Sequence, residues 1–441
     1  MTEVIFSFDT ENFTSNRGAD GILNEAELLR KAGVKGCFCI TGLLAEQLKN
    51  WGRDDVINAL KKHELSLHTY GHSLHPVIDE YTDIEDYEAA LAEFLKQETK
   101  AEDMVKDILK VDKLETTCPP GAQKSYVMLY GYADMGYPSF ASSYAPEDGT
   151  EAYYCNICQL YYSHCLECFL FDAEKEDLVK LLDDIADKKR VIFYTHPDMS
   201  IYTTHWDIVN YNGYNKHPFG EWEFPPEREK KVQEKFLANF KTLIELLKAD
   251  SRFKFTTYGE ITEKLNSEDE RTITPDDIFD IRKTLRENFA PISMPCSLSV
   301  ADVFDAVISF LKGEKKYTCG KVYGFLSEPY AVKETIKISA DDIIEAAKSL
   351  KWTKFLPTEI KVGDVKIGPA DFLFAAMDVI CGDNAVTIEP KNQISNLDIL
   401  PFVRDKVFES KWLHGPDFKD EFLSDRLYYQ AWTLRVPNIN K

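Results

Sequence analysis

The sequence predicts an α/β protein with a mostly parallel sheet or barrel, followed by a second, mainly helical domain. Short apolar runs alternate with segments of helical periodicity through about the first 265 residues, and this βα repetition is typical of parallel sheets and barrels. The chain has 441 residues, which is more than one hydrophobic core usually serves, so two domains are expected.

The elements of the first domain follow from their periodicity. Strands are predicted at Val4–Phe8, Lys35–Ile40, Leu65–Tyr70, Tyr137–Phe140, Tyr153–Tyr162 and Arg190–Tyr194. Helices are predicted at Asn24–Ala32, Asp54–Lys62, Ile84–Leu109, Lys175–Ala186 and Glu227–Leu247. The segment "FKFTTYGEI" and a helix ending near Leu265 follow, and the polar stretch "NSEDERTITPDD" then has the composition of a linker. The expected domains are therefore residues 1–265 and 266–441.

The net charge of the chain limits the kinds of binding partner to be expected. The net charge is −22, from 52 Lys and Arg against 74 Asp and Glu, which disfavours nucleic acid and anionic membranes as partners. No run of about 18 apolar residues is present, so no membrane span is expected. The strand-like "EVIFSF" follows Met1-Thr2 directly without a secretory signal, which predicts a cytoplasmic protein, or a secreted one if an N-terminal segment has been removed.

Histidines are crowded in the stretch "LSLHTYGHSLHP", which holds His68, His72 and His75 of the chain's nine histidines. Because His68 and His72 are four residues apart, one turn brings both rings to a common point, and neutral imidazole is a frequent metal ligand. Gly71 is expected to let that turn close tightly. His75 precedes Pro76 and is expected to be a loop residue. The sequence therefore predicts a metal-binding pair at a strand end, where parallel α/β folds keep their chemistry.

Three further polar motifs follow predicted strands. The first strand ends in "SFDTEN" with Asp9 and Glu11, the turn "TTCPPGAQ" carries the backbone N–H of Gly121, and "VIFYTHPDM" ends in His196. Paired carboxylates often only cap or solvate a chain. Carboxylates, two histidines, a Pro-Pro-Gly turn and a further histidine at separate strand ends nevertheless form a specific combination.

A cysteine-rich segment has two interpretations. Cys155, Cys158, Cys165 and Cys168 have the spacing C-x2-C-x6-C-x2-C, which resembles a zinc or iron–sulfur signature and suggests a second metal or structural cluster. The segment is also rich in Tyr, Phe, Ile and Leu, as a buried strand or hairpin would be, and free cysteine packs as a small hydrophobe. Disulfides are less expected without a secretory signal.

The order of these motifs resembles the polysaccharide deacetylases of the NodB-homology type (carbohydrate esterase family 4), which are metal-dependent enzymes on a distorted (β/α) barrel. The resemblance covers about residues 1–265. His68, Thr69 and His72 match the H-(S/T)-x-x-H metal pair, and "SFDTEN" is similar to the first motif. The resemblance implies that Glu11, His68 and His72 bind the metal and that Asp9 is the catalytic base.

The resemblance also implies the reaction. His196 corresponds to the late histidine that protonates the leaving amine, and the Gly121 N–H would stabilise the oxyanion. The ion would be a divalent metal, in the first place Zn²⁺, with Co²⁺, Ni²⁺ or Mn²⁺ as alternatives. The implied substrate is an N-acetylated poly- or oligosaccharide. The alternatives are a small non-glycan amide, as in allantoinase-like hydrolases, and a catalytically degenerate protein that only binds glycans.

Departures from the family pattern put activity in doubt. Cys118 stands where members usually have an Arg that pairs with the base, so the pKa of Asp9 would depend on the metal or on another cation such as Lys124. The segment "THWDIVNYNGYNKHP" contains Trp206, Tyr211 and Tyr214. These three are candidates for stacking on a sugar ring or for packing in the core.

The second part of the chain predicts helices and a hairpin. "ADVFDAVISF" from Ala301, "DIIEAAKSL" from Asp342 and "ADFLFAAMDVI" from Ala370 each carry Asp four residues before Ala, which indicates repeated helical modules or a shared capping preference. "EIKVGDVKIG" predicts a hairpin around Gly363-Asp364. The run Asp342–Ile380 resembles pseudomurein-binding repeats, which implies a glycan-binding or docking module.

Overall fold

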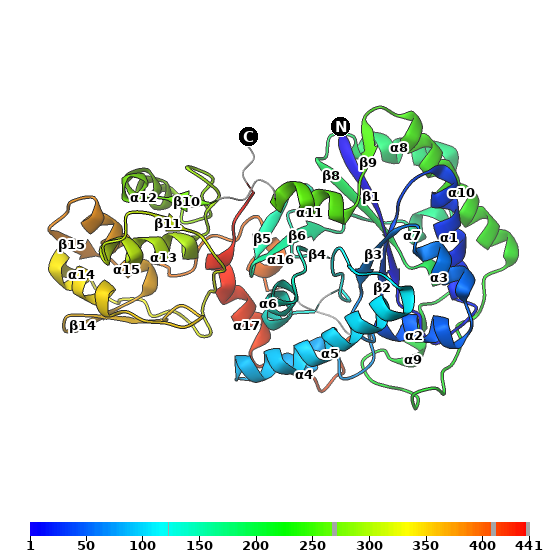
Figure 1. Ribbon diagram of the computed structural model, residues 1–441, viewed down its shortest axis with the longest axis horizontal. Helices are drawn as coiled ribbons and strands as arrows, with labels where there is room; N and C mark the ends of the chain where they lie inside the picture. Colours follow the sequence, from blue (N-terminus) through cyan, green and yellow to red (C-terminus); the bar gives the residue numbers. More distant parts are fainter. Residues whose placement is uncertain (122, 267–270, 407–411, 438–441) are drawn as a thin grey trace. The chain divides into compact units, whose positions relative to one another are not determined.

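The computed structural model describes residues 1–121, 123–266, 271–406 and 412–437 (Figure 1). The chain forms two compact units. The first contains Met1–Glu151, Cys158–Lys264 and the described part of Phe408–Glu421, and the second contains Ala152–Ile157, the described parts of Leu265–Val407 and of Phe422–Lys441. The main division thus lies beside the expected boundary at residue 265, but each unit also takes in one short segment from elsewhere in the sequence. Residues 267–270 of the expected linker lie outside the described residues.

The first unit is built on parallel strands around a buried central strand. Their order is β3-β2-β1-β8-β7, with β9 also pairing β1, and every one of these pairs is parallel. Their bounds are β1 (Thr2–Thr10), β2 (Cys37–Ile40), β3 (Glu64–Leu67), β7 (His164–Cys165), β8 (Arg190–Thr195) and β9 (Phe253–Phe255). The apolar side chains of β1, such as Val4 and Phe8, are fully buried, as in a strand covered on both faces.

The sheet closes into an irregular barrel. Thr117 bridges β3 to β4 (Ser139–Ser142), which pairs in parallel with β6 (Ile157–Tyr161). The N–H of Tyr162 then donates to Ser142 at 3.3 Å, and the next N–H, of Ser163, donates to Ile192 in β8 at 3.2 Å. Two consecutive residues therefore join the two ends of the sheet, which confirms the predicted distorted (β/α) barrel.

Helices surround this barrel (Figure 1). They are α1 (Ala19–Ala32), α2 (Gly42–Asn50), α3 (Asp54–Leu60), α4 (Ile78–Thr82), α5 (Tyr87–Leu109), α6 (Tyr126–Met135), α7 (Glu167–Leu170), α8 (Lys175–Ile185), α9 (Trp206–Asn210), α10 (Lys230–Ala249) and α11 (Tyr258–Asn266), with a 3₁₀ turn at Pro197–Ser200. The predicted helices are confirmed, while α2, α4, α6, α7 and α9 were not expected. Helix α2 begins at Thr41, whose side chain accepts a hydrogen bond from the Leu44 N–H at 3.1 Å.

Two strand predictions were wrong in extent. The run Tyr153–Tyr162 forms β5 (Ala152–Tyr154) and β6 rather than one strand, because Cys155 and Asn156 have φ of 52° and 66° and turn the chain between them. The strand predicted to reach Tyr70 ends with β3 at Leu67, before the left-handed Thr69 at φ 66°.

The second unit is mainly helical, with three small antiparallel sheets. Its helices are α12 (Ile278–Glu287), α13 (Val300–Leu311), α14 (Ala340–Ser349), α15 (Pro369–Ile380), α16 (Pro401–Arg404) and α17 (Leu423–Tyr428), with 3₁₀ turns at Pro275–Asp277 and Tyr429–Thr433. The paired strands are β10 (Thr272–Ile273) with β11 (Tyr317–Thr318), β12 (Ile336–Ser339) with β15 (Ala385–Ile388), and β13 (Ile360–Val362) with β14 (Val365–Ile367). The β13–β14 pair confirms the predicted hairpin.

The Asp residues shared by α13, α14 and α15 are capping residues. Asp302 accepts a hydrogen bond from the Ser299 N–H at 2.9 Å, and Asp371 accepts one from the Gly368 N–H at 3.2 Å. Asp342 accepts one from the Ser339 hydroxyl at 2.6 Å. The three helices also pack on one another. The common Asp therefore reflects helix starts, which is the simpler of the two interpretations of the repeat.

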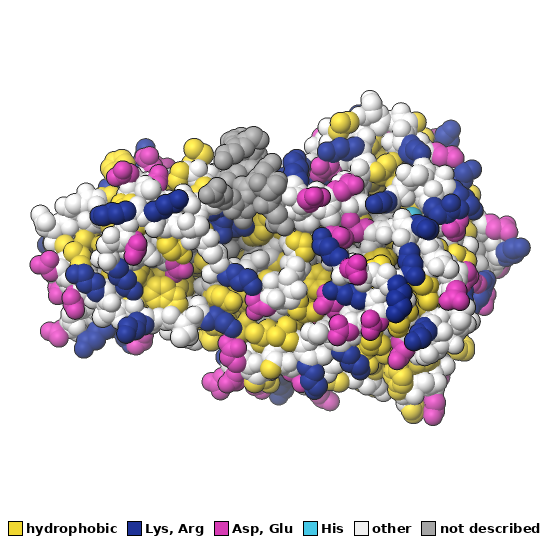
Figure 2. All heavy atoms as spheres, in the orientation of Figure 1, with side chains coloured by type: hydrophobic (Ala, Val, Ile, Leu, Met, Phe, Trp, Pro, Cys, Tyr) yellow, Lys and Arg dark blue, Asp and Glu magenta, His cyan; other side chains and the backbone are white. Residues whose placement is uncertain are grey.

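The surface is charged with both signs. Figure 2 shows Lys and Arg interspersed with Asp and Glu over the face that it presents. Among the residues that the structure describes, no helix is both long and apolar enough to cross a bilayer.

Candidate active site

The carboxyl ends of β1, β3 and β8 meet at one edge of the barrel. Asp9 is the second-last residue of β1, and Glu11 follows that strand directly. His68 follows β3 directly, and His196 follows β8. Together with His72, these side chains line a cavity of about 280 Å³. Its other lining residues are Pro120, Gly121, His205, Asp207, Ile208 and Trp412. The structure therefore brings together the predicted base, ligands, oxyanion residue and late histidine.

Glu11 is the centre of the predicted ligand group. Its Oε2 lies 2.9 Å from His68 Nε2 and 2.8 Å from His72 Nε2. All three side chains are buried, at 2%, 1% and 8% exposure for Glu11, His68 and His72. Burial would raise the pKa of Glu11, but the two histidines and His196 outweigh it, so this pKa lies well below its ordinary value. Glu11 is therefore ionised, as a metal ligand must be.

The turn that pairs the histidines is closed differently from expectation. The left-handed residues are Thr69 and His72, with φ of 66° and 54°, and the His72 N–H donates to Thr69 Oγ1 at 3.0 Å. Gly71 does not supply a positive φ. It is needed because a Cβ there would lie 3.0 Å from Leu43 Cδ1 and 3.1 Å from Leu74 Cβ.

The ligand group fits a divalent metal ion. One ligand atom from each of Glu11, His68 and His72 lies within 4.8 Å of the others. Both Nε2 atoms point at the same carboxylate, while the Nδ1 atoms of the two rings have no hydrogen-bond partner among the described residues. Two imidazoles and one carboxylate are a set found in catalytic zinc sites. Glu11, His196 and His205 meet the same distance limit, but among the described histidines only His68 and His72 lie within 3 Å of the Glu11 carboxylate.

Trp206 is buried in the core and orients Glu11 through a hydrogen bond. Its Nε1 donates to Glu11 Oε1 at 3.1 Å, and its exposure is 0%. Tyr211 is also buried, at 2%, with its ring edge-to-face against Trp206 at 5.4 Å. Tyr214 is 58% exposed and does not line the cavity. Of the two alternatives left open by the sequence, packing in the core therefore describes Trp206 and Tyr211, while Tyr214 lies outside the cavity.

Asp9 has a partner that the sequence did not reveal. The hydroxyl of Tyr162 donates to Asp9 Oδ1 at 3.0 Å, and His196 Nε2 lies 3.8 Å from Oδ2. Burial is the largest influence on Asp9 and raises its pKa, although the charges of His68 and His196 oppose this. A buried carboxylate with a raised pKa is suited to accept a proton.

The position of the missing Arg is apolar. Cys118 is fully buried, with its Sγ 2.8 Å from Cys39 Sγ. Lys124, the cation suggested as a substitute, has its Nζ 3.2 Å from Asp420 Oδ2. Tyr162 therefore provides the hydrogen bond to the base.

His196 is paired with Glu167, a second residue that the sequence did not reveal. Its Nδ1 lies 2.9 Å from Glu167 Oε2, and its backbone N–H donates to the same oxygen at 2.7 Å. Burial lowers the pKa of His196, but the charge of Glu167 outweighs it and the net pKa is well above the ordinary value. Burial likewise opposes ionisation of Glu167, yet His196 holds the pKa of that carboxyl at about 2. The only sequence signal is that Glu167 is the sole carboxylate between Cys155 and Phe171.

The Pro119–Gly121 turn also lines a second cavity, of about 420 Å³. Both cavities are lined by Asp9, Pro120, Gly121, His196 and Trp412. The larger one has a wall of tyrosines, Tyr144, Tyr161, Tyr162 and Tyr194. A Cβ on Gly121 would meet nothing within 4 Å, so the backbone here is open to a ligand.

The cysteines are not gathered into a cluster. Cys155 and Cys158 are buried, Cys165 is partly buried and Cys168 is exposed. Neither of the ligand groups found among the described residues contains a cysteine. The four cysteines lie on different elements: Cys155 is in the turn after β5, Cys158 is in β6, Cys165 is in β7 and Cys168 is in α7.

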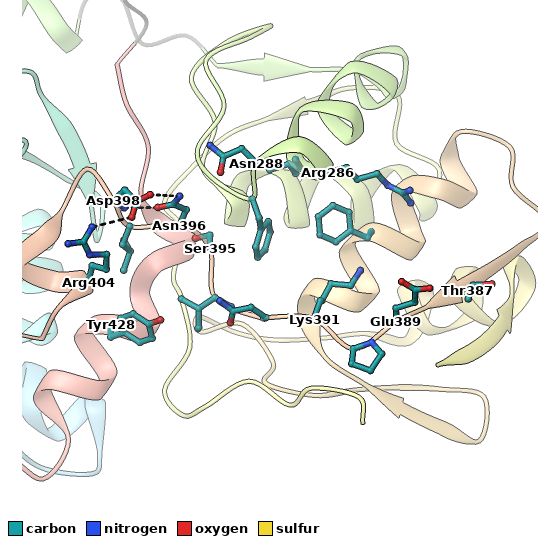
Figure 3. Close-up of a pocket in the computed structure, with 17 residues that line it drawn as sticks. Arg286, Asn288, Thr387, Glu389, Lys391, Ser395, Asn396, Asp398, Arg404 and Tyr428 are labelled. Carbon is teal, nitrogen blue, oxygen red and sulfur yellow. Dashed lines mark hydrogen bonds and ion pairs between the residues drawn. The ribbon is translucent and has the colours of Figure 1, made fainter. Parts of the chain in front are cut away.

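The second unit has a cavity of its own, of about 880 Å³ (Figure 3). Arg286, Lys391 and Tyr428 are among its lining residues, and Asp398 pairs there with Arg404 at 3.2 Å. Its lining includes no histidine or cysteine.

Comparisons with known proteins give structural similarity only. No family model and no curated protein matches the sequence. A solved structure classed as a polysaccharide deacetylase from Mycobacterium smegmatis has a TM-score of 0.40 at 15% identity, over 60% of this chain and 90% of that one. A family 4 carbohydrate esterase from Streptomyces lividans in complex with acetate has a TM-score of 0.32 at 11% sequence identity. The match covers 58% of this chain and 92% of that one. A CE4 family pseudoenzyme from Bacillus anthracis has a TM-score of 0.29 at 14% sequence identity. The match covers 44% of this chain and 55% of that one. At such identities, the chemistry of this chain has to be inferred from its own side chains.

Proposed function

We propose that the first unit is a metal-dependent hydrolase that removes acetyl groups from N-acetylated sugars. The observation that carries this proposal is the meeting of Glu11, His68 and His72 with Asp9 and His196 around one cavity. A ligand set beside a buried carboxylate and a charged imidazole is what hydrolysis of an amide requires.

Glu11, His68 and His72 would hold the ion, for which we propose Zn²⁺, while Co²⁺, Ni²⁺ and Mn²⁺ also suit two nitrogens and one oxygen. A divalent ion supplies polarisation of the acyl carbonyl and a lowered pKa for attacking water. The chain's part is to present three ligands on one side and leave the other side open to the cavity.

Asp9 and His196 would move the protons. Asp9, held by the Tyr162 hydroxyl, accepts the proton of the attacking water. His196, kept protonated by Glu167, donates a proton to the departing amine. The Gly121 N–H is proposed to donate to the oxyanion that forms between these steps.

The larger cavity favours a sugar over a small amide. Its volume of about 420 Å³ is in the range of small-molecule sites. Tyr162 is committed to Asp9 and stacks on Tyr194, but a wall of tyrosines supplies the aromatic surface and phenol groups that suit the C–H side and the hydroxyls of a pyranose.

Metal analysis joined to an acetate-release assay tests the proposal. Wild type, the double variant His68→Ala/His72→Ala and the control His75→Ala, whose Nδ1 contacts Glu80 at 2.9 Å outside the ligand group, would be assayed on N-acetylated oligosaccharides. We expect about one ion per chain and acetate release from wild type and control, and neither from the double variant. Metal without acetate release would favour another amide or glycan binding alone. Metal retained by the double variant would show that these histidines are not the ligands.

A further inference from the structure

A segment from the C-terminal part of the chain contributes to the candidate active site. Residues 412–421 belong to the first unit, although the residues described on either side of them belong to the second. The indole of Trp412 stacks on the ring of His72, with centroids 5.6 Å apart and an interplanar angle of 17°. Trp412 also lines both the ligand cavity and the tyrosine-walled cavity.

Several contacts hold this segment on the barrel. Leu413 is fully buried, and His414 Nε2 lies 2.9 Å from Asp79 Oδ2. Asp420 pairs with Lys124 at 3.2 Å. The backbones approach so closely at Gly415 that a Cβ there would lie 2.7 Å from the Gly213 carbonyl oxygen. These contacts join the segment to three places on the barrel, at Asp79, Lys124 and Gly213, so the position of Trp412 is determined by the packing of the segment.

Trp412 differs from the buried aromatics of the site. Trp206 and Tyr211 are at most 2% exposed, whereas Trp412 is partly exposed and borders the space beside Pro120 and Gly121. One ring face covers His72. The remaining surface is apolar, electron-rich and fixed at the boundary between the two cavities.

We propose that Trp412 positions the sugar, receiving the C–H face of a pyranose that extends from the ligand cavity into the tyrosine-walled cavity. An aromatic face suits this apolar side of a sugar ring, and its position is fixed before binding. This inference rests on the proposed function and adds to it a residue that selects glycans over small acetyl compounds.

Steady-state kinetics with two substrates tests the role of Trp412. Wild type, Trp412→Ala, Trp412→Phe and the control Phe279→Ala, an aromatic of the second unit that is 60% exposed, would be loaded with the same metal. Each would be assayed on an N-acetylglucosamine oligomer and on 4-nitrophenyl acetate, with metal content measured on the same samples. Stacking energies of this kind correspond to roughly tenfold in binding. For Trp412→Ala we expect the oligomer KM to rise about tenfold with kcat changed much less, and the oligomer-to-ester ratio of kcat/KM to fall about tenfold. Trp412→Phe should recover most of the loss.

Other outcomes would overturn the inference in distinguishable ways. An equal loss on both substrates, a fall in kcat at unchanged KM, or loss of metal from Trp412→Ala would show that the indole only supports His72. A Trp412→Ala variant equal to wild type would show that the ring does not contact substrate. If metal-loaded wild type released acetate from neither substrate, the proposed function would fail, and this inference with it.

Discussion

The Tyr162 hydroxyl donates a 3.0 Å hydrogen bond to Oδ1 of Asp9. This contact gives the proposed base a hydrogen-bond partner. The position of the usual Arg is occupied by Cys118, which lies against Cys39 and carries no positive charge. A phenol is neutral, so it orients the carboxylate without the strong lowering of the pKa that a guanidinium would cause. Asp9 accordingly keeps a raised pKa.

Tyr162→Phe should lower kcat on the acetylated oligosaccharide by roughly tenfold to a hundredfold, because the lost hydrogen bond is to a charged group. Metal content should stay at the wild-type level, since the Tyr162 hydroxyl contacts Asp9, Ser7 and Cys39, none of which is a proposed ligand. The measurement is kcat with metal analysis, and Tyr214→Phe, at an exposed position outside the cavity, is the matched control. Wild-type kcat in Tyr162→Phe would mean that Asp9 needs no such partner.

Glu167→Gln should move the basic limb of the pH–rate profile to lower pH. In the wild type the charge of Glu167 keeps the pKa of His196 well above its ordinary value against the effect of burial. Without that charge the pKa of His196 falls, although the charges of Glu11 and Asp9 still raise it, and the protonated acid is lost at a lower pH. The profile of kcat/KM against pH measures this shift, which we expect to be at least one unit. Glu174→Gln, on an exposed carboxylate that pairs with Lys235, is the control, and an unmoved basic limb in Glu167→Gln would exclude His196 as the acid.

The histidine pair of the ligand group could be predicted because its information is local, whereas the family resemblance assigned Glu11 as the third ligand. His68 and His72 are one turn apart, and Glu11 follows a strand whose neighbours in the sheet are parallel, so their carboxyl ends must share an edge. The pairing of β1 with both β2 and β8 then brings motifs that are far apart in sequence to one cavity.

The partners of those residues could not be predicted in the same way. Tyr162 reaches Asp9 across 153 positions, and Trp412 approaches His72 from the C-terminal part of the chain. No periodicity or spacing marks such contacts, which depend on where the barrel closes and on how a distant segment packs. The choice between a sugar-stacking and a core role for Trp206 likewise depends on a distant contact, because its indole N–H donates to Glu11 inside the core.

Replacing the two outer cysteines should leave the metal site intact. Cys165 and Cys168 lie outside both ligand groups found among the described residues. The double variant Cys165→Ser/Cys168→Ser is therefore expected to keep about one ion per chain and the wild-type rate of acetate release. Metal analysis and the acetate assay check this, with His68→Ala/His72→Ala as the variant that loses the ion. A loss of metal from the cysteine variant would make the cysteines the site after all.

Asp305 in the second unit should make stability depend on pH. Burial, followed by the charge of Asp302, raises the pKa of Asp305 to about 7, while a 3.3 Å hydrogen bond from the Tyr317 hydroxyl opposes the shift only in part. The unfolded chain releases this proton near pH 4. Between about pH 4 and pH 7 the folded state thus binds more protons than the unfolded state, and the free energy of unfolding falls as pH rises.

Asp305→Asn keeps the shape of the side chain and removes its charge, so it should stabilise the protein above pH 7 and have little effect below pH 4. Each unit of pKa shift corresponds to about 1.4 kcal/mol, so a gain on the order of 1–4 kcal/mol is expected at pH 8. Urea unfolding of wild type and variant at pH 4 and pH 8 measures the difference, with Asp364→Asn at an exposed hairpin position as the control. A gain that is equal at both pH values would show that the effect does not arise from the ionisation of Asp305, because only a titrating group makes the benefit depend on pH.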